Sequence, residues 1–357
     1  MQSDNSQRRT ADASLLRAIV DQFVERPTHP IGDMKQFERL ALGLIELLDA
    51  NSVARIVRPL CFYPETPLPV FFGLLQKGGA CAELALEFSP GLPRDDLLAT
   101  ARRGAPALAR ALAKRHDLDR DIVEALAQRG EVDVLRALAA NWSAHLDAAA
   151  RRALVLAARD DLTLARILLD RDDRAIEPEA LFLAATRLER TGIILDACRR
   201  ALATGLPENH RADASFISRL ERAAVRRDRD AMAALLADTL ECRKERARAL
   251  LSDVHGEALA LALAALGVDA DAATRLFLCA DPAISYDIER VRGLIALVRS
   301  TPQRAAMQII ASMTGAAKGE REGARRLARD EAPAGSGWRR ALPRAGAETA
   351  RKFDQSA

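Results

Sequence analysis

Residues 93–118 read PRDDLLATARRGAPALARALAKRHDL, and residues 119–146 read DRDIVEALAQRGEVDVLRALAANWSAHL. The two stretches coincide when Arg103-Gly104 is placed on Arg129-Gly130, at an offset of about 26 residues, a period typical of stacked structural repeats. A third, looser copy follows in residues 147–173, DAAARRALVLAARDDLTLARILLDRDD. The chain therefore repeats one unit at least three times in its first half.

Each unit contains two short runs with apolar residues at helical spacing, separated by an Arg-Gly or Arg-Asp-Asp break. This pattern predicts one helical hairpin per unit. A single hairpin cannot bury its apolar stripe, whereas stacked hairpins bury a continuous core. Alanine, leucine and arginine dominate the chain, and aromatic residues make up only 4% of it. We therefore predict an all-α fold, an α-solenoid of HEAT-like helical hairpins.

The apolar periodicity begins near Ser14 and fails beyond Gly315. The residues before the first position are polar, and those after the second are rich in Gly, Ala, Pro and Arg, a composition typical of disorder. We predict four regions along the chain. They are a disordered N-terminus at 1–12, the HEAT-like helical repeat region at 13–205, a C-terminal helical region continuing the array at 206–314, and a disordered, mildly basic tail at 315–357.

The residue types that bind metals or take part in catalysis are scattered along the sequence and form no recognisable motif. The five cysteines form no C-x-x-C pair and the five histidines form no H-x-x-x-H pair, so we predict no metal site. No Gly-rich phosphate loop or G-x-S-x-G elbow is present, and we predict no catalytic residue, no cofactor and no enzyme activity. No apolar run is long enough to span a membrane. We expect a cytoplasmic protein with reduced thiols.

One basic cluster has a regular spacing. A helix predicted from Ala212 to about Arg229 carries four arginines on one arc, which we call the arginine face. It consists of Arg219, Arg222, Arg226 and Arg229. Regular guanidinium spacing suits phosphate binding, but interleaved acids such as Glu221 and Asp228 favour an ordinary solvated face. Both interpretations remain open at this stage.

The aromatic residues gather near residues 62–72. This cluster consists of Phe62, Tyr63, Phe71 and Phe72. We interpret it either as a groove for a partner or as rings that fill the end of the core. Trp142 stands alone in the repeat region, and we predict that it packs at the end of a hairpin.

Two stretches resemble a known family. They are LARALAKRHDLDRDIVEALAQRGEVDVLRALAAN and RPLCFYPETPLPVFFGLLQKGGACAELALEFSPGLPRDDLLATA. They are similar to a bacterial family of HEAT-like helical-repeat proteins catalogued as a domain of unknown function, and Ala139-Ala140-Asn141 is similar in style to leucine-rich-variant repeats. The resemblance covers about residues 14–314. It implies an intracellular bacterial protein of helical-repeat fold and transfers no active site.

Repeat architecture without a catalytic constellation predicts a non-enzymatic interaction or regulatory scaffold, which binds an unidentified protein partner through the solenoid surface. The alternative is a nucleic-acid-binding protein that uses the arginine face and the basic tail, with binding that weakens steeply as salt is added.

Overall fold

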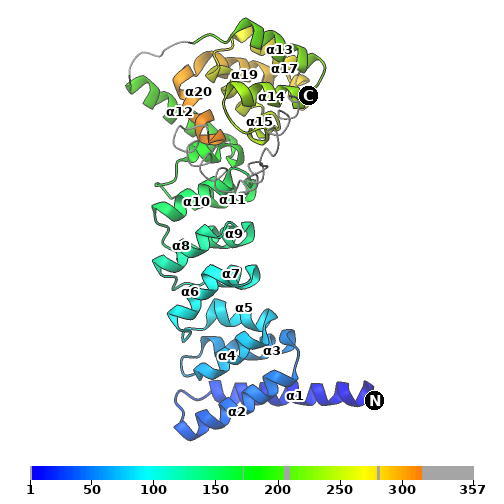
Figure 1. The fold of residues 1–357 in the computed structure, drawn as a ribbon, viewed down its shortest axis with the longest axis vertical. Coiled ribbons are helices and arrows are strands. Elements are labelled where there is room, and N and C mark those ends of the chain that lie inside the picture. Colours follow the sequence, from blue (N-terminus) through cyan, green and yellow to red (C-terminus); the bar gives the residue numbers. More distant parts are fainter. Residues whose placement is uncertain (1, 172, 205–209, 280–281, 316–357) are drawn as a thin grey trace, which may run out of the picture.

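The computed structural model describes residues 2–171, 173–204, 210–279 and 282–315. Every regular element in these ranges is a helix, so the predicted all-α fold is confirmed. The helices of the N-terminal half pair into hairpins that are stacked one above another, and the C-terminal half forms a module at the end of this stack (Figure 1).

The stack has two layers of helices. One layer contains α1 (Gln2–Val24), α3 (Ala50–Val57), α5 (Gly79–Phe88), α7 (Pro106–Leu112), α9 (Val132–Ala140) and α11 (Leu162–Asp170), each packed on the next. The other layer contains α2 (Ile31–Leu47), α4 (Leu68–Lys77), α6 (Arg94–Arg103), α8 (Arg120–Gln128) and α10 (Ala148–Ala158). The 3₁₀ helix η1 (Arg58–Phe62) follows α3 directly. One apolar core runs through the stack from Leu16 to Leu181.

Aspartate side chains start several of these helices. Asp119, Asp147 and Asp161 are the N-cap residues of α8, α10 and α11, and each carboxylate accepts a hydrogen bond from a backbone N–H of the first turn. These caps satisfy donors that an isolated helix leaves unpaired. The pKa of the Asp147 carboxyl lies below its ordinary value, chiefly because it accepts this bond from Ala150. The acidic links between the repeats therefore define where the helices begin.

The C-terminal module is organised around two helices, α16 (Glu257–Ala265) and α20 (Gln303–Thr314). All residues of α16 from Ala258 to Ala265 are buried, so this helix has no polar face to present to water. Around it lie η2 (Pro178–Ala184), α12 (Arg187–Ala203), α13 (Ala214–Val225), α14 (Arg229–Thr239), α15 (Lys244–Leu251), α17 (Ala270–Leu278), α18 (Pro282–Ser285) and α19 (Ile288–Ser300).

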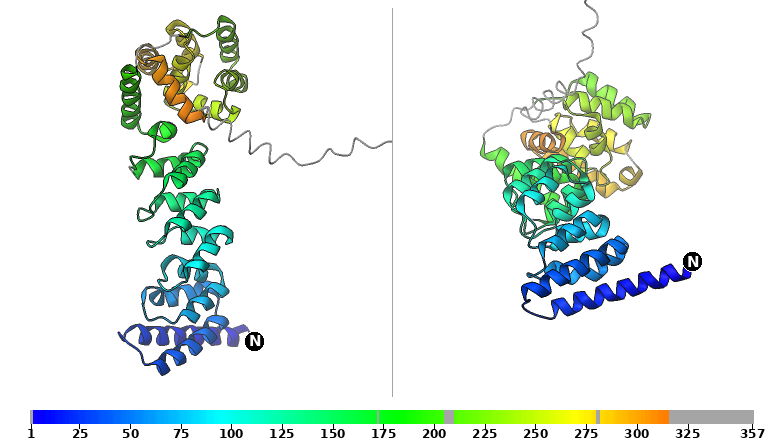
Figure 2. Two further views of the ribbon diagram at one scale, coloured as in Figure 1. Left: turned by 60° about the vertical axis from the view of Figure 1, so that its left-hand side comes forward. Right: turned by 60° about the horizontal axis from the view of Figure 1, so that its bottom comes forward.

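The final helix folds back toward the stack. α20 packs on α16, α12 and η2, and η2 in turn packs on α11, the last helix of the stack (Figure 2). We had predicted that residues 206–314 continue the array. The helices of this region pack around α16, and α20 supplies one of its apolar neighbours.

The structure contradicts the prediction at the N-terminal end of the chain, and it describes almost none of the predicted C-terminal tail. Residues 2–12, which we predicted to be disordered, belong to α1. The apolar periodicity of this helix begins near Ser14. Because residues 2–24 contain no proline or glycine that would break it, the helix extends back to Gln2. Of the tail predicted at 315–357, all but Gly315 lies outside the described residues.

Candidate functional site

Three polar side chains form a ladder of hydrogen bonds along the side of the stack where α5, α7, α9 and α11 end. They are Arg115, Asn141 and Arg171, and we call them the ladder. Each donates hydrogen bonds to backbone carbonyls of the preceding hairpin. They occupy equivalent positions in the three repeats, at the offsets of about 26 and 30 residues found in the sequence.

Arg115 is the first rung, and only 3% of it is exposed. Its Nη1 donates to the carbonyl oxygens of Leu86 and Ser89, both at 2.9 Å. Its Nε and Nη2 donate to the two carboxylate oxygens of Asp117, both at 2.7 Å. These charge-assisted bonds hold the pKa of the Asp117 carboxyl below its usual value. A buried guanidinium with such partners is well satisfied.

Asn141, the second rung, is 8% exposed and ends α9. Its Nδ2 donates to the carbonyl oxygens of Ala113 and Arg115, at 2.9 and 2.6 Å. Its Oδ1 accepts from the backbone N–H of Ser143 at 3.0 Å. One amide thus joins the end of α7 to the turn after α9.

Arg171, the third rung, holds this same turn from the other side. Its Nη1 donates to the carbonyl oxygens of Ala139 and Asn141 at 3.0 and 2.6 Å, and its Nη2 donates to the carbonyl of Ala144. Partial burial lowers the pKa of the Arg171 guanidinium, because desolvation disfavours its charge. The backbone of residues 139–144 is therefore fixed from both neighbouring hairpins.

The Trp142 turn, residues 141–146, carries an aromatic side chain on this fixed backbone. We had predicted that Trp142 packs at the end of a hairpin, and this is wrong, since 69% of it is exposed. The side chain of the preceding Asn141 points into the stack, where it bonds to the carbonyls of Ala113 and Arg115. On the other side of Trp142, Ser143 Oγ lies 3.3 Å from Nδ1 of the exposed His116. A large ring on a rigid turn is the kind of side chain that anchors protein interfaces.

The arginine face is divided in the structure. α13 ends at Val225, so Arg219 and Arg222 lie on α13, Arg226 is its C-cap and Arg229 begins α14. Arg227 adopts a left-handed backbone (φ 54°), and its N–H donates to the carbonyl of Ala224. This is the geometry of a helix end. The four arginines therefore do not form one continuous helical stripe.

The predicted aromatic cluster does not form one groove either. Phe71 is buried in the core and 2% exposed, whereas Phe62 is 56% exposed and packs on Phe88 with ring centroids 4.9 Å apart. The Tyr63 hydroxyl donates to the carbonyl of Arg26 and so faces the α1–α2 link. Phe72 is half-buried on α4. Filling of the core accounts for Phe71, and Phe62 and Tyr63 make separate local contacts.

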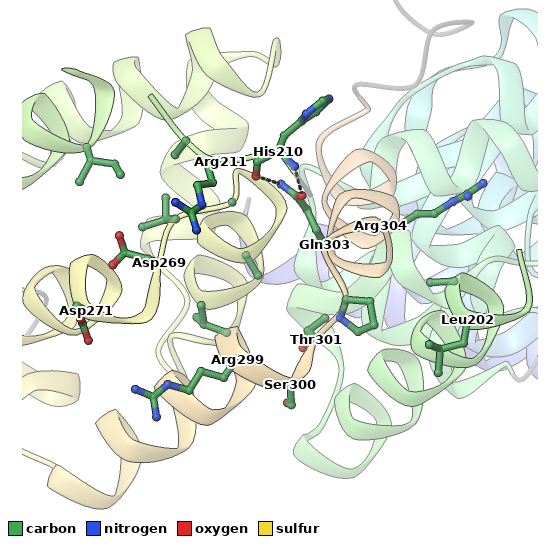
Figure 3. Close-up of a pocket in the computed structure, with 18 residues that line it drawn as sticks. Leu202, His210, Arg211, Asp269, Asp271, Arg299, Ser300, Thr301, Gln303 and Arg304 are labelled. Atoms are coloured by element: carbon green, nitrogen blue, oxygen red, sulfur yellow. Dashed lines mark hydrogen bonds between the residues drawn. The ribbon is translucent and has the colours of Figure 1, made fainter. Parts of the chain in front are cut away.

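A cavity of about 840 Å³ lies in the C-terminal module between α12, the α16–α17 turn and the start of α20. Arg211 and Asp269 lie on one side of it, and Leu202 and Arg304 on the other (Figure 3). At its centre the Gln303 amide accepts from the N–H of His210 at 2.8 Å and donates to the carbonyl of His210 at 2.9 Å. Gln303 thereby fastens the α12–α13 link, and we regard its role here as structural.

No group of three or more metal-ligating side chains exists among the described residues. The cysteines are free thiols, and burial raises the pKa of the Cys61 thiol to about 11. Within the described ranges, no helix is both long and apolar enough to cross a bilayer.

The fold and the Trp142 turn define a class of protein, a stack of helical hairpins that presents a fixed aromatic turn. Residues 81–181 match the model of a family described as an uncharacterised protein conserved in bacteria (DUF2336). The match contains the whole ladder and the Trp142 turn. No curated protein and no solved structure matches the chain.

Proposed function

We propose that this chain is a non-enzymatic scaffold that binds a protein partner through the Trp142 turn. The observation that carries the proposal is the combination of a 69% exposed Trp142 with a backbone held by Asn141 and Arg171. Exposed tryptophan is costly in water and is enriched among the side chains that dominate protein interfaces. Its presence on a turn held by hydrogen bonds from both neighbouring hairpins favours a binding role.

The rigidity of the turn favours affinity. Ordering a mobile loop on binding costs free energy, and a turn that is already fixed in the free protein avoids that cost. The ladder fixes the turn from α7 on one side and α11 on the other. Loss of a buried tryptophan anchor costs about 2 kcal/mol or more at an interface, which is roughly a 30-fold loss of affinity.

The test is quantitative affinity capture from the native host with three forms of the full chain: wild type, Trp142→Ala and Leu156→Ala. Leu156 is the matched control, because it is a large apolar residue on α10 of the same stack and is 54% exposed. We expect a protein whose recovery falls at least about 10-fold with Trp142→Ala and is unchanged with Leu156→Ala. Equal recovery of every captured protein by all three forms would refute the proposal.

Two finer assignments belong to the same proposal. The hairpins are of the HEAT-like class, in keeping with two helices per unit and stacking of successive units. The protein acts in the cytoplasm, where unpaired thiols such as buried Cys61 and Cys81 persist in reduced form.

A further inference from the structure

Helix α20 begins in the wall of the cavity in the C-terminal module, which we call the α20 cavity, and its first turn is uncapped. Pro302 is the N-cap residue, and no side chain caps the helix. The first N–H that is bonded belongs to Ala306, which donates to the carbonyl of Pro302 at 3.1 Å. Within the described residues, the preceding N–H groups of Gln303, Arg304 and Ala305 therefore have no acceptor. Such groups give a helix N-terminus the partial positive charge that attracts anions.

A buried hydroxyl at the same place also lacks a partner. Thr301 directly precedes the N-cap residue of α20, lines the α20 cavity and is only 6% exposed. Its Oγ1 forms no hydrogen bond with any residue that the structure describes. Figure 3 shows Thr301 between Ser300 and Gln303 in the wall of the cavity. Because buried hydroxyls are normally hydrogen-bonded, this one points to a ligand atom that completes its bonding.

Two arginines with open donor groups flank this position. Arg299 and Arg304 line the α20 cavity and lie on either side of the start of α20 (Figure 3). Both are exposed, and neither forms an ion pair with a described residue. By contrast, Arg292 on the same helix as Arg299 pairs with Glu289 at 2.7 Å. A guanidinium whose donors are open suits the bidentate binding of a phosphate group.

The opposite side of the α20 cavity carries carboxylates. Asp269 and Asp271 lie across the cavity from the start of α20 (Figure 3). Oδ1 of Asp269 accepts from the N–H of Ala272 at 2.7 Å and so caps α17. Asp271 is exposed and forms no ion pair with the described residues. Carboxylate oxygens at this side accept hydrogen bonds from hydroxyl or amino groups and repel a second phosphate.

Apolar side chains supply much of the remaining wall. They include Leu202, Ile217, Val268 and Val298. The volume of about 840 Å³ is far larger than a phosphate ion requires and lies within the range of small-molecule sites, roughly 300–1,000 Å³. The α20 cavity therefore combines an anion-binding end, apolar walls and an end that accepts hydrogen bonds. A nucleotide carries the matching groups, which are a phosphate, a flat ring and hydroxyl or amino donors.

We propose that the α20 cavity binds a nucleoside monophosphate, with the phosphate at the N-terminus of α20 and the hydroxyl and amino groups toward Asp269 and Asp271. The free N–H groups of the first turn, the Thr301 hydroxyl and the two flanking guanidinium groups bind the phosphate oxygens. The Gln303 side chain is held by its bonds to His210, so this wall is ordered before the ligand enters. The site is separate from the Trp142 turn and goes beyond the scaffold function proposed above.

The first test is calorimetric titration of the full chain with inorganic phosphate and with each of the four ribonucleoside monophosphates. Wild type is expected to bind at least one nucleotide at least about 10-fold more tightly than phosphate, because only the nucleotide reaches the apolar walls and the carboxylates. Arg299→Ala and Arg304→Ala are each expected to weaken that nucleotide at least about 10-fold. Arg292→Ala, the control on α19 outside the cavity, is expected to leave it unchanged.

Two results of this titration would overturn the proposal. The first is no binding of any of the five probes at millimolar concentration. The second is equal affinity for phosphate and all four nucleotides, which would show an adventitious anion only.

The second test uses Thr301→Val to separate a binding role from a structural one. Valine keeps the branched shape and lacks the hydroxyl, which has no partner within the described residues. The substitution is therefore expected to leave the urea midpoint of unfolding unchanged or slightly higher, and to weaken the nucleotide about 5-fold. Lower stability with unchanged affinity would assign Thr301 to the structure alone and would overturn its place in the site.

The third test fixes the orientation of the ligand. Asp271→Asn is expected to weaken the nucleotide about 5-fold or more, because a neutral amide is a poorer acceptor than a carboxylate. The affinity for inorganic phosphate is expected to stay the same or to rise, because a negative charge is removed from the far side of the cavity. Equal weakening of phosphate and nucleotide by Asp271→Asn would overturn the proposed orientation.

Discussion

Replacement of Asn141 by alanine removes three hydrogen bonds at once. The side chain donates to the carbonyls of Ala113 and Arg115 and accepts from the N–H of Ser143. Asn141 is 8% exposed, so water reaches the orphaned groups poorly. The substitution also leaves a small void between α7 and the Trp142 turn.

The magnitude follows from the number of bonds and their burial. Each of the three hydrogen bonds contributes about 0.5–1.5 kcal/mol to stability, and carbonyls left unpaired add a further penalty. We therefore expect the free energy of unfolding to fall by about 2–4 kcal/mol. Asn141→Asp is expected to be worse than Asn141→Ala at neutral pH. Its carboxylate would face two carbonyl oxygens, which repel it.

The assay is urea unfolding followed by circular dichroism, with the slope of the transition checked for equality between variants. Ser143→Ala is the matched control, because it keeps the backbone N–H that Asn141 accepts and loses only the hydroxyl near His116. The control is expected to change stability by less than about 0.5 kcal/mol. If Asn141→Ala destabilises no more than this control, the ladder does not hold the stack together and the reasoning fails.

Further predictions concern pH, backbone conformation and nucleic acid. The hydrogen bonds from Arg166 lower the pKa of the Glu189 carboxyl from 4.5 to about 2. The stabilisation of the folded protein by these bonds is therefore complete above pH 4.5 and is lost as the pH falls toward 2. A Glu189→Gln variant should show a flatter acid-unfolding curve in this pH range. Gly267 has φ +71°, and an added Cβ would lie 1.8 Å from the carbonyl oxygen of His210, so Gly267→Ala should cost at least about 2 kcal/mol in urea unfolding. Gly43→Ala, with open space around it, should instead gain up to about 1 kcal/mol, and a loss there would contradict the packing of α2. The scaffold proposal predicts no tight binding of the wild-type chain to duplex DNA at low salt; tight binding that alanine at all four positions of the arginine face abolishes would favour the nucleic-acid alternative.

The repeated units were predictable because their signal is local. Apolar spacing predicted the helices, and in the structure Asp119, Asp147 and Asp161 cap three of them. The repeat offset also aligns Arg115, Asn141 and Arg171, so the ladder positions were visible as a column. The hydrogen bonds of these side chains were not predictable, since each bond to a backbone carbonyl joins residues about 26–32 positions apart and depends on how the hairpins stack.

The arginine face was mispredicted for a specific reason. Helices usually end at glycine, whose backbone adopts positive φ readily, and no glycine lies between Ala212 and Arg229. The structure ends α13 with Arg227 in that conformation instead. Buried contacts of Ala223 and Met232 on the two sides of this turn favour the bend over continuation of the helix. Tertiary packing thus overrode the local preference.

Trp142 was mispredicted because composition alone favours burial of aromatic rings. The neighbouring Asn141 and Ala144 occupy the inward positions of the turn and leave the ring outside. The helical state of residues 2–12 was missed for the opposite reason. Their polarity resembles disorder, but no residue there breaks a helix that the following apolar stripe has already nucleated.

Site-specific photo-crosslinking at position 142 in living cells tests the central claim most directly. A photoreactive phenylalanine derivative at position 142 is expected to give one prominent covalent adduct with another protein, and the same derivative at position 156 is expected to give none of comparable yield. The adduct at position 142 should also weaken when Asn141 is replaced by alanine, because the turn is then no longer fixed. Identical adduct patterns at positions 142 and 156, or no adduct at position 142, would contradict the claim that the stack presents Trp142 to a protein partner.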